Sequence, residues 1–168
     1  MQITVRHARE EDLEGAGAVT VEAFVGGGHT EPDSPYLALL GDARRRFAEA
    51  ELLVAVDDAD RVLGCVTFAS GGTEWADIAE PHEGEIRMLA VGAAAQGRGV
   101  GEALVRAAMA RSRELGLTAM AFSTRPAMTT AHRLYERLGF RRTPERDWAP
   151  RPGIDLLTYG LTFEDQLI

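Results

Sequence analysis

The amino-acid sequence predicts one α/β domain over residues 1–168, with a mixed central β-sheet flanked by helices in the order βααβββαβαββ. Three observations lead to this prediction. Segments with helical spacing of apolar residues alternate with strand-like segments, and two apolar runs at 52–56 and 62–68 flank an acidic turn, as in a β-hairpin. The length of 168 residues is enough for one hydrophobic core and short for two.

The first third of the chain predicts one strand and two helices. Residues 2–6 alternate in the manner of an edge strand, and residues 10–24 carry apolar side chains at helical spacing behind an acidic first turn. Gly26-Gly27-Gly28 ends this helix. A second helix is capped by Asp33 or Ser34, has Pro35 in its first turn and runs to about residue 50.

The rest of the chain alternates between strands and helices. Glycine or proline marks most of the expected boundaries, as at Gly116, Pro126 and Gly139. The expected elements after the hairpin are a loop at 70–83, a strand at 85–91, a helix at 100–115, a strand at 118–123, a helix at 127–138 and a strand pair at 140–146 and 156–161.

Charge and composition exclude several classes of function. The net charge of -8 is unfavourable for nucleic acid or an anionic membrane, so neither is an expected partner, while a homodimer stays open. All 18 basic residues are arginine, which excludes lysine Schiff-base chemistry. Cys65 is the single cysteine, no secretory signal is visible and no apolar run is long enough for a bilayer, so we expect a cytoplasmic protein.

A glycine-rich turn precedes the helix expected at 100–115. Gln96-Gly97-Arg98-Gly99-Val100-Gly101 lets the backbone approach a ligand closely, and the N–H groups at a helix start suit a diphosphate, with Arg98 as an additional positive charge. The spacing fits neither a P-loop, which needs lysine, nor a dinucleotide-binding GxGxxG motif, because Glu102 stands where the last glycine would be. A glycine-rich turn without a ligand is the alternative.

Three blocks together resemble the GNAT acetyltransferase superfamily. Residues 96–101 fit its Q/R-x-x-G-x-G/A signature, Glu85–Val91 is similar to its central strand, and residues 131–140 are similar to its A-x-x-L-Y-E-x-x-G-F segment. The blocks occur in the family's order, and the resemblance covers nearly the whole chain, most strongly from residue 84 to residue 140.

The resemblance implies an enzyme that moves an acetyl group from acetyl-CoA directly to an amine of a small molecule or peptide. It also implies that the central strand carries a bulge and that pantetheine pairs with its backbone. Met128 stands where many relatives have an asparagine that binds pantetheine, and Thr129, Thr130 or a water is the expected substitute. The implied acetyl-CoA-binding residues are Leu89, Ala90, Val91, Gln96, Gly97, Arg98, Gly99, Val100, Gly101, Glu102 and Met128.

Two residues are catalytic candidates. Glu85 matches a position where some relatives keep a catalytic glutamate, so we expect it to accept the amine proton; Glu83 and His82 are lesser candidates. Tyr135 matches the family's acid, which protonates the leaving thiolate. The structural alternatives are a strand-end carboxylate paired with an arginine for Glu85 and a core-packed ring for Tyr135.

The histidines, the cysteine and the run of three arginines do not indicate a further catalytic site. The histidines are scattered and no paired cysteines occur, so no metal is expected. Cys65 reads as a small buried hydrophobe, and Arg44-Arg45-Arg46 as the solvated end of a helix. The acceptor is expected to contact residues 25–40, 70–83 and 146–153. The alternative functions are a non-catalytic acetyl-CoA-binding module, a partner-binding protein that uses the fold only as a scaffold, and a transferase that uses another short acyl-CoA.

Overall fold

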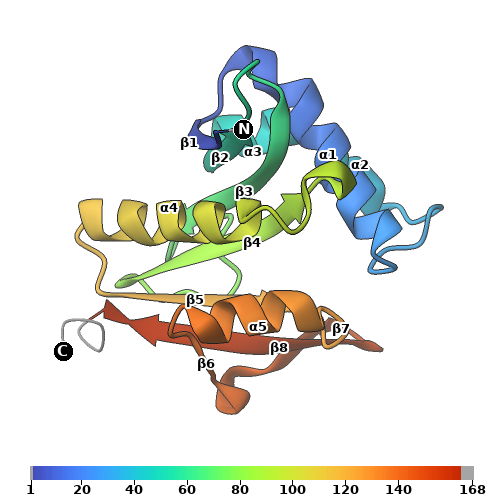
Figure 1. Cartoon of the computed structure of the whole chain (residues 1–168). Helices are drawn as coiled ribbons and strands as arrows, with labels where there is room; N and C mark the ends of the chain where they lie inside the picture. The colour runs from blue at the N-terminus through green and yellow to red at the C-terminus, as the bar shows by residue number, and fades with distance from the viewer. Residues whose placement is uncertain (1, 164–168) are drawn as a thin grey trace. The chain divides into compact units, whose positions relative to one another are not determined.

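The structure is a computed structural model that describes residues 2–163 (Figure 1). The strands are β1 Thr4–His7, β2 Glu51–Val56, β3 Val62–Ser70, β4 Glu83–Val91, β5 Ala119–Thr124, β6 Arg141–Arg142, β7 Trp148–Arg151 and β8 Ile154–Thr162. The helices are α1 Leu13–Gly26, α2 Tyr36–Gly41, α3 Ala43–Glu49, α4 Val100–Glu114 and α5 Thr129–Arg137, with short 3-10 turns η1 Glu10–Asp12, η2 Ala93–Ala95 and η3 Pro144–Arg146.

The described chain forms two compact units. Unit 1 contains the chain up to Phe68 and Ile86–Ala108, and unit 2 contains Ala69–Glu85 and the chain from Met109 onward. In unit 1, β1, β2 and β3 pair antiparallel in sequence order. In unit 2, the first residues of β4 pair in parallel with β5, and β5 pairs antiparallel with β8. These pairings confirm the predicted α/β class with a mixed sheet.

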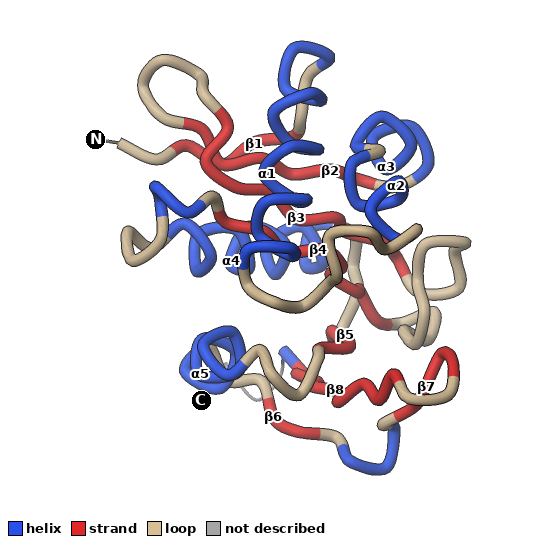
Figure 2. Tube along the Cα trace, turned by 90° about the vertical axis from the view of Figure 1, so that its right-hand side faces the viewer, coloured by secondary structure: helices blue, strands red, loops and turns tan. Residues whose placement is uncertain are grey.

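Within unit 1, alternation along β3 directs neighbouring residues to different helices. The Cys65 side chain contacts α1, where its Sγ lies 3.2 Å from Thr20 Oγ1. A Cβ on the next residue back, Gly64, would lie 3.0 Å from Val100 and 3.2 Å from Leu104 of α4. Figure 2 shows α1 passing across the strands of this unit. Cys65 is 1% exposed, as expected for a small buried hydrophobe.

Within unit 2, α5 packs on β5 and β8 through aromatic rings (Figure 1). The Phe122 ring of β5 contacts Tyr135 of α5 at a centroid distance of 4.4 Å, edge to face. Phe140 lies 5.0 Å and Tyr159 6.0 Å from the same Phe122 ring. Edge-to-face and offset pairs are the favoured aromatic arrangements, so this cluster fixes the helix on the sheet.

The second predicted helix is interrupted, so the prediction of one continuous helix to about residue 50 was wrong. Asp42 leaves the helical region at ψ 68°, and its carboxylate accepts a hydrogen bond from the Arg45 amide, capping α3. Arg46 is also not solvated: its side chain is fully buried and donates to the carbonyl oxygens of Leu39 and Leu40 at the end of α2. The chain therefore turns sharply here because local capping and a buried guanidinium satisfy the backbone groups.

The expected strand pair after residue 140 is replaced by three strands. β6 comprises only Arg141 and Arg142, because Pro144 begins a 3-10 turn that the sequence prediction had placed inside a strand. β7 follows this turn, and both β6 and β7 pair with β8. The turn places Arg146 in contact with residues from much earlier in the sequence.

Candidate functional site

The predicted phosphate-binding turn lies in unit 1 and is open to solvent. Gln96, Gly97, Arg98 and Gly99 are exposed, and Gly97 and Gly99 have φ values of 79° and 80°, which favour glycine. A Cβ on either glycine would meet no atom within 4 Å. The turn therefore leaves room for a ligand directly before α4, where the N–H groups of the first turn and the helix dipole favour an anion.

The segment that leads into the turn is held by α1. Glu22 accepts a hydrogen bond of 2.8 Å from the Ala93 amide at the start of η2, and the Gly92 amide donates to the Leu63 carbonyl oxygen of β3. A Cβ on Gly92 would lie 3.0 Å from the Val19 side chain, a tight contact, so the chain passes close to α1 at this point. These contacts fix where the chain leaves β4 and hence where the turn begins.

The end of β4 in unit 1 departs from a regular strand. Met88 has a φ of 54°, a left-handed conformation that is uncommon for a residue other than glycine. Such a residue interrupts the pleat and redirects the backbone groups that follow, as a β-bulge does. After it, Leu89 and Val91 are partly exposed and Ala90 is buried at 2% exposure. The predicted pantetheine-binding residues therefore follow directly on a local distortion of the strand.

Glu85, the expected base, lies in unit 2 and is buried at 1% exposure. Its Oε1 accepts hydrogen bonds of 2.9 Å from the amides of Ile78 and Ala79. Burial raises the pKa of the carboxyl group, and the negative charge of Asp77 acts in the same direction, whereas the backbone hydrogen bonds partly oppose the rise. A carboxylate with a raised pKa is a better proton acceptor near neutral pH than an ordinary glutamate.

Glu83, a lesser candidate for the base, is held in an ion pair. Both of its oxygens accept hydrogen bonds from the Arg146 guanidinium, at 2.9 and 3.0 Å. Burial acts to raise the pKa of Glu83, but the hydrogen bonds from Arg146 and from the backbone outweigh it, and the pKa is lowered. Glu83 is therefore the weaker proton acceptor of the two glutamates.

Tyr135, the expected acid, is buried at 5% exposure in the aromatic cluster of unit 2. Burial raises the pKa of its phenol, so the group keeps its proton at neutral pH. Its hydroxyl has no hydrogen-bond partner among residues 2–163. A hydroxyl that makes no hydrogen bond within the described residues is available to donate to a bound molecule.

Met128 lies directly before α5, where many relatives have asparagine. Its Sδ accepts a hydrogen bond of 3.6 Å from Thr124 Oγ1, and its carbonyl oxygen accepts from the His132 amide. The thioether cannot reproduce the donor of an asparagine amide. Thr129 and Thr130, the expected substitutes, are both exposed in the first turn of the helix.

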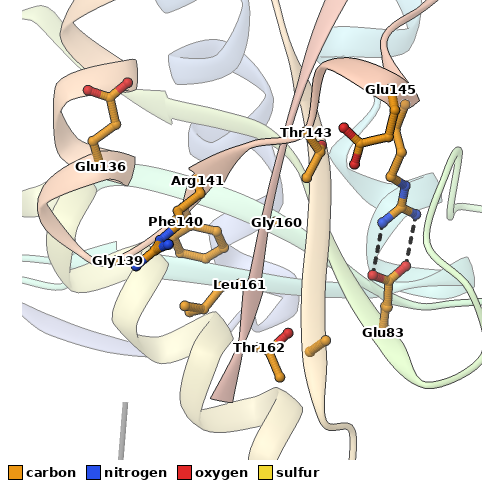
Figure 3. Close-up of a pocket in the computed structure, with 12 residues that line it drawn as sticks. Glu83, Glu136, Gly139, Phe140, Arg141, Thr143, Glu145, Gly160, Leu161 and Thr162 are labelled. Carbon is orange, nitrogen blue, oxygen red and sulfur yellow. Dashed lines mark hydrogen bonds and ion pairs between the residues drawn. The ribbon is translucent and has the colours of Figure 1, made fainter. Parts of the chain in front are cut away.

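A cavity of about 530 Å³ lies in unit 2, and Figure 3 shows the side chains around it. The Glu83–Arg146 ion pair forms part of its wall, and Glu145 lies beside this pair (Figure 3). Glu136 lies on α5, where it accepts a hydrogen bond of 2.8 Å from the Tyr159 hydroxyl. The residues that line the cavity are Glu83, Ala119, Glu136, Gly139, Phe140, Arg141, Thr143, Glu145, Arg146, Gly160, Leu161 and Thr162.

The predicted site residues therefore form two groups. The strand residues Leu89–Val91 and the turn with the start of α4, residues 96–102, belong to unit 1, whereas Glu85, Met128 and Tyr135 belong to unit 2. Sequence reasoning missed the left-handed Met88 and the role of Arg146, since no local pattern marks either residue. Trp75, which lies in the segment 70–83 expected to contact the acceptor, is buried at 4% exposure.

Across residues 2–163, no three histidine, cysteine, aspartate or glutamate side chains gather as a metal site requires. None of the helices in the same range combines the length and apolar character needed to span a bilayer.

Comparison with known proteins identifies relatives of known family. The chain is 34% identical over 142 residues to a mycothiol acetyltransferase of Propionibacterium freudenreichii, a match that covers 80% of this chain and 41% of that protein. The chain thus spans less than half the length of the curated relatives it matches.

Solved structures give the same fold. A GCN5-related N-acetyltransferase from Kribbella flavida superposes with a TM-score of 0.71 at 27% identity, covering 95% of this chain and 97% of that one. The PaiA N-acetyltransferase from Thermoplasma acidophilum, solved in complex with coenzyme A, has a TM-score of 0.71 at 17% identity, covering 96% and 99%. Residues 18–140 match the acetyltransferase (GNAT) family. The chain therefore belongs to the GNAT acetyltransferase family.

Proposed function

We propose that the chain is an N-acetyltransferase that moves an acetyl group from acetyl-CoA directly to an amine, and that its two units act together as one domain. The observation that carries this proposal is the open turn before α4. This turn matches the family-specific phosphate signature, and the lack of side chains at Gly97 and Gly99 leaves space for a ligand. The family supports the reaction, and the turn supports its acetyl donor.

The proposed donor site combines backbone and charge. The amides from Gly97 to Gly101 bind the diphosphate, Arg98 adds positive charge, and the backbone at Leu89 and Val91 pairs with pantetheine. Acetyl-CoA supplies the activated acetyl group as a thioester. The amides that follow Met88 are also suited to stabilise a developing oxyanion, because fixed backbone donors need no reorganisation during the reaction.

The chemistry requires proton transfers at the amine and at the leaving thiolate. A primary amine is protonated near neutral pH, with a lysine-like pKa of about 10.4, so a base must remove a proton before the nitrogen attacks. Glu85 is the proposed base, directly or through one water molecule. The carbon–nitrogen bond forms and the carbon–sulfur bond breaks. Tyr135 is proposed to donate its proton to the departing thiolate, and the second proton that the nitrogen loses as it becomes an amide restores the Tyr135 phenol.

The test is an acceptor screen with release of coenzyme A as the readout. The acceptors are small amines, amino acids, aminoglycosides, peptides and, prompted by the name of the relatives, compounds of the mycothiol type. A thiol reagent reports coenzyme A with little background, because the single cysteine, Cys65, is buried; thiol-containing acceptors are followed by mass spectrometry instead.

The outcomes separate the candidate functions. Acetylation of one acceptor class supports the proposal, and a parallel series with propionyl-CoA identifies a preference for another short acyl group. Binding of acetyl-CoA without turnover of any acceptor would favour a non-catalytic binding module. Absence of acetyl-CoA binding in calorimetry would refute the proposal.

A further inference from the structure

The loop before β4 is fastened to this strand by two carboxylates. The amides of Ile78 and Ala79 donate to Glu85 Oε1, and the amide of Glu80 donates to Glu83 Oε1, each at 2.9 Å. Glu83 and Glu85 are two residues apart on a strand, so their side chains lie on the same face. Three consecutive loop amides are thus held by two side chains of the strand.

Arg146 closes this arrangement from a distant part of the sequence. Its Nη1 donates to Glu83 Oε2 at 3.0 Å, and its Nη2 donates to Glu83 Oε1 and to the Ile78 carbonyl oxygen, both at 2.9 Å. The two ion-pair contacts are the dashed lines in Figure 3. One guanidinium therefore binds both the strand carboxylate and the loop backbone, a geometry that suits its planar set of donors.

The loop is closely packed as well as hydrogen bonded. The Gly71 amide donates to the Glu83 carbonyl oxygen at 2.8 Å, and a Cβ on Gly71 would clash with the Glu80 carbonyl group. Glu83 is only 8% exposed and Arg146 27%, so the pair is largely removed from water. Loss of one partner would leave a buried charge, which destabilises the contacts around it.

We propose that Arg146 is a positioning residue for Glu85: it holds the loop at residues 78–80, and the loop amides orient the Glu85 carboxylate. The proposal rests on the proposed function, in which Glu85 is the base. Arg146 does not touch the reacting atoms and acts through Ile78 and Glu83. Its role is to keep one oxygen of the Glu85 carboxylate hydrogen bonded to the loop amides and to fix the plane of that carboxylate.

The charges around Glu85 give the expected direction of a change in pKa. Burial is the largest cause of the raised pKa; Asp77 in the loop adds to it, and the loop amides oppose it. Hydrogen bonding to Glu83 is the largest cause of the raised pKa of Arg146, and the charges of Glu83, Glu80 and Glu85 add to it against the opposing effect of burial. If the loop loosens, water reaches the Glu85 carboxylate and removes the effect of burial. The pKa of Glu85 then falls toward its ordinary 4.5.

The test compares Arg146→Lys with a matched control, Arg142→Lys. Lysine keeps the charge but loses the fork of donors that binds carboxylate and carbonyl together. Arg142 is bonded in the same way, to both oxygens of Asp147 at 2.8 and 2.7 Å and to the Thr158 carbonyl oxygen at 2.7 Å, and it does not contact the 78–80 loop. The control therefore reproduces the chemical change without the proposed connection.

Amide hydrogen exchange is the first readout and needs no substrate. In Arg146→Lys, exchange at Ile78 and Ala79 should become about tenfold faster, whereas the Thr158 amide, which donates to Asp147, should be unaffected. Arg142→Lys should give the reverse pattern. Glu83→Gln, which removes the charge opposite Arg146 but keeps an acceptor for the Glu80 amide, should accelerate Ile78 and Ala79 less strongly.

The pH profile of kcat/KM, measured with an acceptor from the screen, is the second readout. Arg146→Lys should lower kcat/KM about tenfold and move the acidic limb to lower pH, while Arg142→Lys leaves that limb in place. A purely structural role would lower stability without moving the limb. Unchanged exchange at Ile78 and Ala79 in Arg146→Lys, or an unmoved limb, would overturn the proposal.

The failure of the proposed base has a different signature. Glu85→Gln keeps an oxygen that accepts from Ile78 and Ala79 but cannot accept a proton. Full turnover in Glu85→Gln would refute Glu85 as the base, and with it the catalytic half of the Arg146 proposal. Faster exchange at Ile78 and Ala79 in Arg146→Lys would still establish that Arg146 holds the loop.

Discussion

Replacement of Gly99 by alanine tests the proposed acetyl-CoA site most directly. Gly99 has a φ of 80°, and a Cβ there would meet no atom of the protein within 4 Å. The backbone strain of a left-handed alanine is roughly 1–2 kcal/mol, and the less flexible unfolded chain offsets roughly 0.4–1 kcal/mol of it. We therefore expect Gly99→Ala to lower the free energy of unfolding by about 1 kcal/mol.

The effect on acetyl-CoA should exceed this strain. A methyl group in the turn occupies the space proposed for phosphate oxygens, and one lost hydrogen bond to a charged group corresponds to roughly 1.5–3 kcal/mol. Because about 1.4 kcal/mol is a factor of ten, the dissociation constant for acetyl-CoA should rise about 10- to 100-fold. Isothermal titration calorimetry measures this constant, and urea unfolding measures the stability.

Gly116→Ala is the matched control. Gly116 has a φ of 77°, a Cβ there would also meet no atom within 4 Å, and it follows the opposite end of α4. The two variants should lose similar stability, but only Gly99→Ala should lose affinity. Equal acetyl-CoA affinity in both folded variants would refute the assignment of the turn, and Gly99→Val would extend the test to a larger side chain.

Four further predictions concern the acid, the base and the pH dependence of stability. Tyr135→Phe should lower kcat roughly 10²-fold with little change in acetyl-CoA affinity, since only the proton donor is lost; a wild-type kcat in steady-state assays would return Tyr135 to a packing role. Glu85→Gln should lower kcat/KM mainly on the acidic side of the pH profile, because at high pH more of the amine is already neutral; a uniform loss would indicate acceptor binding through charge. Glu85→Gln should also change the pH dependence of stability. The pKa of Glu85 in the folded protein is raised above 4.5, so the wild type loses stability as the pH rises from about 4.5 through that pKa. The variant should not show this loss. The pKa of Asp147 is lowered from 3.8 to about 2, mainly by hydrogen bonds from Arg142 and also by one from the Thr158 backbone. Asp147 therefore stabilises the fold above pH 3.8, and this contribution is lost as the pH falls through 2. The side chains of Arg142 and Asp147 are partly exposed, at 30% and 29%, so Asp147→Asn should lower the free energy of unfolding by only about 1 kcal/mol at neutral pH. Urea unfolding at a series of pH values measures this effect. An unchanged loss of stability at acidic pH in the variant would contradict this account.

The sequence by itself determined the features that depend on neighbouring residues. The glycines at 97 and 99 predicted a turn whose backbone a ligand can approach closely, and both adopt the positive φ that glycine permits. The hairpin of β2 and β3 followed from two apolar runs and a four-residue acidic turn, because pairing of adjacent strands is a local event. The family also followed from the order of three short motifs.

The sequence also named Glu85 and Tyr135 as candidates, but it did not determine their surroundings. The expected alternative for Glu85 was an arginine partner, whereas the structure shows loop amides at Oε1 and assigns the arginine to Glu83. The raised pKa of Glu85 therefore comes from burial, which depends on the whole packed unit. The burial of Tyr135 likewise depends on rings contributed by other elements of unit 2.

Only the tertiary structure decided the features that join distant segments. Arg46 belongs to a run of three arginines, and it is buried because the carbonyl oxygens at the end of α2 accept its hydrogen bonds. Met88 adopts a left-handed φ that no propensity of methionine predicts. Arg146 meets Glu83 across 63 positions of sequence, at the end of a 3-10 turn that the sequence prediction had placed in a strand. Local patterns fix backbone preferences over a few residues, whereas the partners of a buried charge are fixed by which segments pack together.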